Sequence, residues 1–383
     1  MNYGVILLII ALIFAIIGKQ NRTKNSFLII STILFLGFSY NMGGDWRAYK
    51  LFYEKITPKL SISNPLNTKF EEGYIILNYI FNKLGINYEL FQAIVLILCI
   101  FIILKLVEKK SKNFYIAFVY IFIQFLFSYS AEPILRQFIA TTLIIIGFKY
   151  IEERKILKYL IWVFLAFQFH KSAIIGIIFY LSNYLNFKSK KKILICIILA
   201  FIISLNIDSI LNLLIRLIPF LHTYSGYLRN EIYSSIAQRS LMGNLYLIIT
   251  VCIYFAIIIY TKYEKEYRVY LNLAILGIIF GIFANRFFIL VRFNSYFVFP
   301  IAITISNIDR LNFNLKIKKL CIFFILFIQI FTKYYTILRD ENSKKRYYYY
   351  QNYLIEVFKG KNTKSYYLRE SFMRNLDKDT IYD

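Results

Sequence analysis

Long apolar runs constrain the fold of this chain more than any other feature of its sequence. A helix needs roughly 20 apolar residues to cross the hydrocarbon core of a bilayer, and such runs recur from the N-terminus to residue 335. They are centred on 4–18, 26–40, 88–106, 114–130, 133–149, 157–170, 172–186, 191–206, 243–261, 268–285, 287–306 and 319–335. The pattern predicts an all-α, polytopic integral membrane protein with about 12 transmembrane helices.

Composition supports this class and argues against nucleic acid as a partner. Of the 383 residues, 59% are hydrophobic and 19% are aromatic, well above the level of a soluble domain. The net charge is +25, but Lys and Arg alternate from loop to loop and form no continuous basic stripe. The four Cys each stand alone in an apolar run without a CxxC pair, so we expect core thiols and no metal site.

Short basic loops predict the orientation in the membrane. Almost half of the Lys and Arg residues lie in loops that the positive-inside rule assigns to the cytoplasm, namely 19–25, 105–113, 149–158, 187–192, 262–268 and 309–319. This assignment places the N-terminus outside. The first apolar run lacks a cationic start and a cleavage site, so we expect it to be a retained span. We expect one transmembrane domain over 1–335 with long outer loops at 41–87 and 207–242, and a basic, Tyr-rich tail over 336–383 that is also outside.

Polar clusters gather at the predicted outer ends of the spans. They are Gly43–Arg47, Glu71–Gly73, Arg136–Gln137, Phe169–Ser172, and Arg286 with Arg292. Ionisable groups are costly to hold near membrane-embedded helix ends, so their convergence on one side predicts a site for a charged substrate. The outer segment 224–233 adds Tyr, Asn, Arg and Glu, which suit a sugar, although an interfacial aromatic belt explains the Tyr equally well.

Arg136 is the strongest candidate for binding an anion. It lies one turn into the fifth run, after Glu132 and Pro133, where a fixed charge and a helix N-terminus both favour an anion such as a diphosphate. Arg286 and Arg292 flank the turn between two later runs and are expected to complete a cationic pocket with it. The alternatives are an ion pair between Arg136 and Glu132, or arginines that anchor to lipid headgroups.

Three residues are candidates for proton transfer. His170 lies at a very tight outer turn, where it would accept a proton from a substrate hydroxyl or donate a hydrogen bond to a phosphate. Asp45, preceded by two glycines, and Glu72 are the best-placed carboxylates. In the structural alternatives, His170 is a packed histidine, and Asp45 pairs with Arg47 and caps a short helix.

The ordered set of motifs is similar to a known family. The matching stretches are Asn41–Tyr49, Phe70–Tyr74, Leu135–Ala140, Phe167–Ala173 and Val291–Tyr296. Together they resemble the EpsG-type membrane proteins of bacterial exopolysaccharide and capsule synthesis, which are related in role to the Wzy O-antigen polymerases of lipopolysaccharide. Gly43-Gly44-Asp45-Trp46 departs from the Gly-Thr-Asp form associated with the family.

This resemblance implies a polysaccharide polymerase with a GT-C-like glycosyltransferase architecture. Such an enzyme lies in the bacterial cytoplasmic (inner) membrane and joins oligosaccharide repeat units carried on undecaprenyl diphosphate, with its active site facing the periplasm or exterior. The expected transfer is inverting and uses no metal or other cofactor. The implied partners are these lipid-linked oligosaccharides and membrane lipids, with a flippase and a chain-length regulator as further partners.

Under this reading each candidate residue takes a role in the transfer. The diphosphate is held by arginines, the proton is taken by one of three bases, and side chains near the arginines contact the sugars. The residues expected to bind the diphosphate are Arg136, Arg292 and Arg286, of which Arg136 is also catalytic. The candidate bases are His170, Asp45 and Glu72, and the residues expected to contact the sugars are Gln137, Trp46 and Tyr296.

Other functions are compatible with a multi-span chain that carries these groups. A glycan ligase shares the donor and the chemistry and differs only in its acceptor. A lipid-linked oligosaccharide flippase would be expected to show internal duplication, which the sequence lacks. A membrane O-acyltransferase would receive its acyl donor from the cytoplasm, whereas His170 is predicted outside.

Overall fold

The described part of the chain is built from helices. The computed structural model describes residues 2–17, 21–39, 46–59, 70–127, 135–185, 189–205, 267–286, 290–307 and 352–359, with a few single residues besides. Every regular element among these residues is helical, and one isolated bridge pairs Ser39 with Asn352. The all-helical fold class is therefore confirmed.

The helices follow the apolar runs closely, except that 243–261 and 319–335 lie almost wholly outside the described residues. In chain order they are α1 (Asn2–Ile17), α2 (Arg22–Thr32) with the π-helical η1 (Ile33–Gly37), α5 (Tyr88–Lys110), α6 (Phe114–Ile121) with the π-helical η2 (Phe122–Leu126), α8 (Leu135–Glu152), α9 (Ile156–Phe167), the short series η3 (Lys171–Ile175), α10 (Gly176–Phe179) and η4 (Tyr180–Asn183), α11 (Lys190–Leu205), α16 (Arg268–Arg286) and α17 (Val291–Ser306).

Within the described ranges, one helix has both the length and the apolar composition to cross a membrane. It is α5, Tyr88–Lys110. Shorter apolar helices occupy Ile6–Ala15, Phe114–Leu126, Ile156–Phe167, Lys171–Asn183 and Arg268–Ala284. The count of about 12 spans thus stays a prediction.

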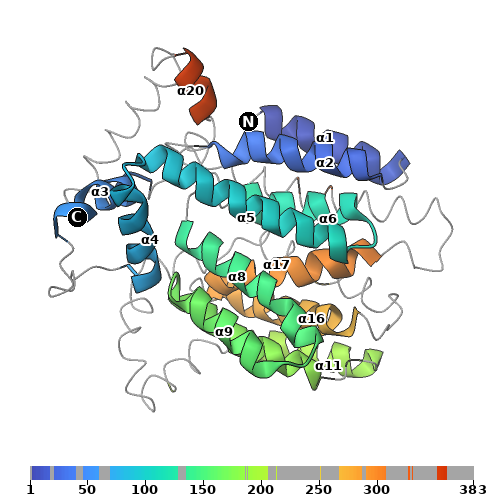
Figure 1. The fold of residues 1–383 in the computed structure, drawn as a ribbon. Coiled ribbons are helices and arrows are strands. Elements are labelled where there is room, and N and C mark those ends of the chain that lie inside the picture. The colour runs from blue at the N-terminus through green and yellow to red at the C-terminus, as the bar shows by residue number, and fades with distance from the viewer. Residues whose placement is uncertain are drawn as a thin grey trace.

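Two further helices cover one end of the molecule. The outer loop 41–87 contains α3 (Trp46–Lys59) and α4 (Glu72–Lys83), and both lie where α5 begins (Figure 1). Tyr53 Oη donates to the Ile86 carbonyl at 2.6 Å, and Lys50 Nζ lies 2.6 Å from a Glu89 oxygen. These bonds attach α3 to the N-terminal end of α5. Part of the predicted outer loop is thus helical and packs on the start of α5.

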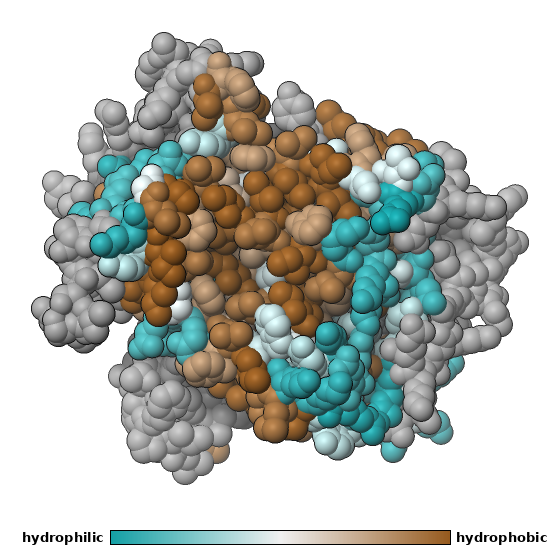
Figure 2. Space-filling view, viewed as in Figure 1, coloured by the Kyte–Doolittle hydropathy of each residue, from teal (hydrophilic) through white to brown (hydrophobic). Residues whose placement is uncertain are grey.

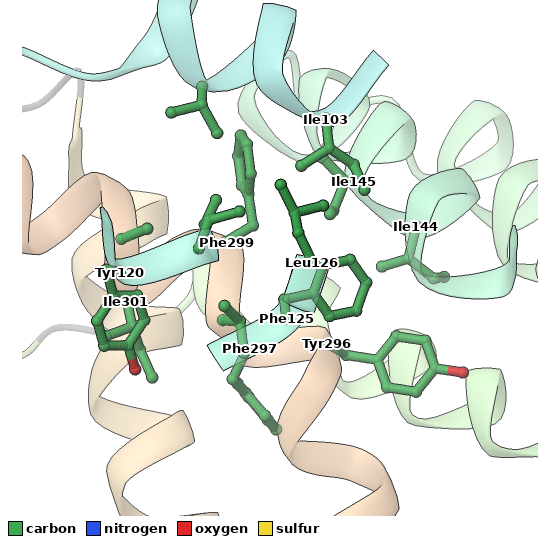
Figure 3. Close-up of a cluster of buried hydrophobic side chains, with 14 of the residues drawn as sticks. Ile103, Tyr120, Phe125, Leu126, Ile144, Ile145, Tyr296, Phe297, Phe299 and Ile301 are labelled. Atoms are coloured by element: carbon green, nitrogen blue, oxygen red, sulfur yellow. The ribbon is translucent and has the colours of Figure 1, made fainter. Parts of the chain in front are cut away.

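The remaining helices stack in layers. In Figure 1, α1 and α2 lie on one side of α5 and α6, while α8, α17, α9, α16 and α11 follow on the other side. Side chains of α6, η2, α8 and α17 fill the space between them, among them Phe125, Ile145, Phe297 and Phe299 (Figure 3). Tyr296 extends its hydroxyl away from this apolar cluster (Figure 3).

The surface of the molecule suits contact with lipid. The centre of the face in Figure 2 is hydrophobic, and hydrophilic residues gather on both sides of it. Large apolar side chains are strongly exposed there and elsewhere; on α9, Ile161 is 58% and Phe164 is 63% exposed. A soluble monomer rarely exposes apolar area on this scale, whereas hydrocarbon solvates it without penalty.

A short piece of the C-terminal tail docks at the same end as α3 and α4. Asn352 precedes α20 (Tyr353–Lys359) and donates through Nδ2 to the Leu34 carbonyl at 2.9 Å. Tyr353 N–H donates to the Phe38 carbonyl at 2.8 Å, and its hydroxyl accepts from Asn87 Nδ2 at 3.2 Å. Residues 34–39 and 87 belong to the predicted outer ends of their spans, so residues 352–359 lie at the end where the tail is expected.

Candidate functional site

Arg136 lies close to the start of α8 and under the helices of the outer loop. Its Nη1 forms an ion pair with Glu71 Oε2, and its Nε donates to Tyr49 Oη at 3.1 Å. The guanidinium carbon lies 4.8 Å from the centre of the Phe70 ring. Only 18% of the Arg136 side chain and 9% of the Glu71 side chain are exposed. The cation is therefore held in one orientation by three side chains from two other segments of the chain, α3 and residues 70–71.

This arrangement leaves part of the guanidinium available. Nη2 of Arg136 has no hydrogen-bond partner among the described residues, although Nε and Nη1 are both occupied. A guanidinium presents five donors in a rigid planar fork, so the described residues leave one edge for an anion. The predicted alternative partner, Glu132, lies outside the described residues together with Pro133.

Glu71 connects Arg136 to the turn that carries His170. Its second oxygen, Oε1, accepts the Lys171 backbone N–H at 3.2 Å. Nearby, the Gly73 N–H donates to the Gln168 carbonyl at 2.9 Å. A Cβ on Gly73 would lie only 2.8 Å from both the Cβ and the carbonyl oxygen of Gln168, so the close approach of α4 to this turn requires glycine.

Sequence reasoning selected Glu72 and missed its neighbour. Glu72 is exposed, whereas Glu71 points into the site. A signal was present: Glu71, Tyr74 and Asn78 are spaced as one face of a helix, and Tyr74 and Asn78 are both fully buried. That face leads inward, so the carboxylate on it is the one that reaches Arg136.

His170 is held by its own turn at the end of α9. Its Nδ1 accepts the Ser172 backbone N–H at 3.2 Å and lies 2.5 Å from Ser172 Oγ, which is 2.9 Å from Tyr296 Oη. Because Nδ1 is an acceptor in this network, the network assigns the proton of the neutral ring to Nε2. His170 therefore presents a hydrogen-bond donor to the site. Ser172 is a site residue that sequence reasoning did not select by itself.

Burial is the main reason that His170 stays neutral. Burial is the main cause that lowers its pKa below the usual value of 6.5, and the positive charges of Arg136 and Arg292 lower that pKa further. The carboxylate of Glu71 acts in the opposite direction. The ion pair between Arg136 and Glu71, whose Oε1 accepts the Lys171 N–H, places both of these charges beside the His170 turn.

Gln137 joins α8 to the beginning of α17. It is 1% exposed, and its Nε2 donates to the Arg292 carbonyl and to Ser295 Oγ, the latter at 3.0 Å. The Arg292 side chain itself is exposed. The structure thus brings Arg136, Gln137, His170 and Arg292 together, as the shared outer position of their motifs predicts.

The other predicted residues are placed as follows. Asp45 lies outside the described residues, as does the side chain of Arg286 at the end of α16. Trp46 is 6% exposed and packs edge-on against Tyr88, with 5.6 Å between ring centres. Tyr296 is fully buried with its hydroxyl on Ser172. The sugar contacts proposed for Gln137, Trp46 and Tyr296 stay predictions, and each side chain lies against protein in this structure.

Metal ligands do not cluster in the part of the chain that is described. No group of three or more His, Cys, Asp or Glu residues there is arranged to hold a metal ion. Cys99 and Cys196 are free, single thiols, while Cys252 and Cys321 lie outside the described residues.

Comparison with known families identifies the chain. The model of the EpsG family matches residues 24–353, a range that contains all of the motifs described above. The chain belongs to the EpsG family. Neither a curated protein nor a solved structure matches it. Membership of the EpsG family makes this a membrane protein of polysaccharide biosynthesis with a polymerase-type role.

Proposed function

We propose that this EpsG-family protein is a polytopic, GT-C-like membrane glycosyltransferase that polymerises oligosaccharide units carried on undecaprenyl diphosphate. The observation that carries the proposal is the open edge of the Arg136 guanidinium, held near the start of α8 between Glu71 and Tyr49. A diphosphate needs fixed, bidentate donors, and an arginine at a helix N-terminus provides them.

The arginines would act on the leaving group. Negative charge grows on the diphosphate oxygen as the bond to the anomeric carbon breaks, and preorganised cations stabilise that charge. Arg136 supplies the oriented cation and Arg292 adds a second positive charge near the His170 turn. Glu71 holds Arg136 in place, and its negative charge limits how tightly the diphosphate product binds.

His170 would act as a donor and not as the base. Its Nδ1 accepts hydrogen bonds from Ser172, so the Nε2–H is the group available to a phosphate or sugar oxygen. The attacking hydroxyl would then lose its proton to a carboxylate, either Glu72, which is exposed at the start of α4, or Asp45. Direct displacement by that hydroxyl inverts the anomeric carbon and needs no metal ion.

The site would open to the outer face of the bacterial cytoplasmic membrane. The basic loops 105–113 and 149–158, together with Arg268 at the start of α16, lie at the opposite ends of the helices from Arg136, and basic loops mark the cytoplasmic side. Substrates would reach such a site after a flippase has moved them across the membrane. A chain-length regulator is a further proposed partner.

The test is the length distribution of surface and lipid-linked glycan, resolved on a gel. We compare cells that carry the intact gene, no gene, Arg136→Ala, Arg136→Lys, or the control Arg22→Lys, which changes an exposed arginine at the start of α2. Lysine keeps the charge but loses the fork, so Arg136→Lys should lower the polymerisation rate by about 10- to 100-fold, the equivalent of about one charged hydrogen bond.

The outcomes separate the candidate functions. Collapse of the ladder to single repeat units in the deletion and Arg136→Ala, with a shortened ladder in Arg136→Lys and a normal one in Arg22→Lys, supports the polymerase. Full-length polymer in Arg136→Lys overturns the role given to its guanidinium. Long polymer that stays on its lipid carrier in the deletion strain identifies a ligase, and repeat units trapped on the cytoplasmic side identify a flippase.

A further inference from the structure

A charged cavity lies at the opposite end of α8 from Arg136. The 16 residues from Arg136 to Glu152 span roughly 24 Å of helix at 1.5 Å per residue. At that far end the structure has a cavity of about 250 Å³ where α5, α8, η4 and α16 meet. Its charged lining consists of Lys110, Glu152, Arg154 and Arg268, and Asn183, Tyr267 and Tyr270 add neutral polar groups.

The lining carries more positive than negative charge. Lys110 Nζ lies 2.5 Å from a Glu152 oxygen, so these two side chains neutralise each other. Arg268 donates from Nη2 to the Asn183 carbonyl, a neutral partner, and forms no ion pair with a carboxylate of the described residues. The side chain of Arg154 has no hydrogen bond or ion pair with any described residue. Two arginines are thus left for an anion, beside the first turn of α16.

The backbone of Arg154 is also unusual. Its φ is 56°, and the following Lys155 N–H donates to the Tyr150 carbonyl at 2.8 Å, which is how a helix ends in a left-handed residue. Glycine is the preferred residue at such a position, because a Cβ is unfavourable there. The chain instead has an arginine, which brings a positive charge to the cavity in spite of the local strain.

We propose that this cavity binds the phosphate group of an anionic ligand. Paired arginines suit phosphate because each offers parallel N–H donors, and cavities between helix ends on the cytoplasmic side of membrane proteins bind phospholipid headgroups. Lys110 and Arg154 belong to the basic loops 105–113 and 149–158, and Arg268 stands at the start of α16. The phosphate comes from an anionic lipid of the adjacent leaflet or from a soluble phosphate compound. Once bound, it would tie together the ends of α8 and α16.

Native mass spectrometry of the purified full chain tests this site. The detergent-solubilised protein is incubated with equal amounts of phosphatidylglycerol and phosphatidylcholine that have the same acyl chains, with or without inorganic phosphate. Wild type should retain phosphatidylglycerol in preference. Arg154→Gly should lower that retention about fivefold, the contribution of one basic side chain near an anionic headgroup. Arg154→Lys should keep most of it, and the exposed control Arg22→Gln should change nothing.

Arg154→Gly separates binding from folding. Glycine suits the backbone at this position, so the variant should melt no lower than wild type, and lost retention cannot then come from misfolding. If the glycine variant folds poorly, Arg154→Gln removes the same charge, and its retention of phosphatidylglycerol is measured instead.

The results show whether the cavity binds phosphate at all, and whether that phosphate belongs to a lipid or to a soluble compound. Two results assign the cavity to a soluble phosphate compound. In the first, added phosphate displaces the bound lipid. In the second, the protein shows no lipid preference, and phosphate stabilises wild type but not Arg154→Gly. Equal phosphatidylglycerol retention by wild type, Arg154→Gly and Arg154→Gln, with no effect of phosphate, overturns the proposal. Arg136 plays no part in this test, so either proposal can fail without the other.

Discussion

Replacing Gly73 by alanine tests the geometry that positions Glu71. The new Cβ would lie 2.8 Å from the Cβ and carbonyl oxygen of Gln168, whereas ordinary contacts begin at 3.4 Å. The carbonyl oxygen belongs to the backbone and cannot rotate away, so α4 must retreat from the α9–η3 turn by about 0.6 Å.

This movement has a calculable effect. A retreat of that size lengthens the Gly73 N–H to Gln168 carbonyl bond from 2.9 Å to about 3.5 Å, beyond the normal range. Overpacking costs about 1–3 kcal/mol and the weakened hydrogen bond about 1 kcal/mol. Alanine returns up to about 1 kcal/mol through helix propensity. The net loss of stability is about 1–3 kcal/mol, and the contacts of Glu71 with Arg136 and Lys171 are displaced.

The assay is thermal unfolding of the purified protein, combined with the glycan ladder in cells. Gly281→Ala is the matched control, because a Cβ at that position in α16 meets nothing within 4 Å and the change should stabilise the helix slightly. We expect Gly73→Ala to melt several degrees lower and to make short glycan. If both alanine variants match or exceed wild type in stability and polymer length, the close contact between α4 and the His170 turn is wrong.

Three further predictions address the site. Glu71→Gln removes the charge that pairs with Arg136 and should destabilise the protein by about 1–3 kcal/mol. The exposed Glu72→Gln should leave the melting temperature unchanged, yet shorten the glycan if Glu72 is the base. Equal melting temperatures for the two variants would contradict the burial assigned to Glu71. The pKa of His170 is lowered by burial and by Arg136 and Arg292, so the unfolded chain takes up a proton first as the pH falls through about 6.5. Wild type should therefore lose stability below that pH, and His170→Gln should lose less. Melting curves between pH 7.5 and 5 test this, and parallel curves for the two proteins would refute a lowered pKa. Tyr296→Phe removes the hydroxyl that contacts Ser172 and should lower the polymerisation rate, so that lipid-linked single repeat units accumulate. An unchanged ladder would show that the Tyr296–Ser172–His170 chain has no role.

The helices were largely predictable from sequence, because the apolar runs and the basic loops act over short stretches of chain. The spans around α1, α5, α8, α16 and α17 match their apolar runs. The run 172–186 does not form one regular helix. It divides into η3, α10 and η4, because tertiary contacts such as the 2.8 Å bond from Tyr159 Oη to the Gly176 carbonyl hold it in a tighter path. Periodicity cannot report such contacts.

The candidate site shows the same division. Arg136 and His170 were recognisable in the sequence as isolated polar groups at the ends of apolar runs, where they are expensive to keep. The choice of Glu71 over Glu72 required the docking of α4 on the turn after α9. The assignment of His170 as a donor required the positions of Ser172 and Tyr296, which are 124 residues apart in the chain.

Hydrophobicity and loop charge by themselves determined which segments form helices and which end of each helix carries the polar motifs, because both properties depend on neighbouring residues. Only the tertiary structure decided which carboxylate faces Arg136, which nitrogen of His170 holds the proton, and that Arg154 and Arg268 share a second cavity. The reason is physical: these pairings join residues from separate helices, and the geometry of a contact between helices is set by packing over the whole molecule and not by local sequence.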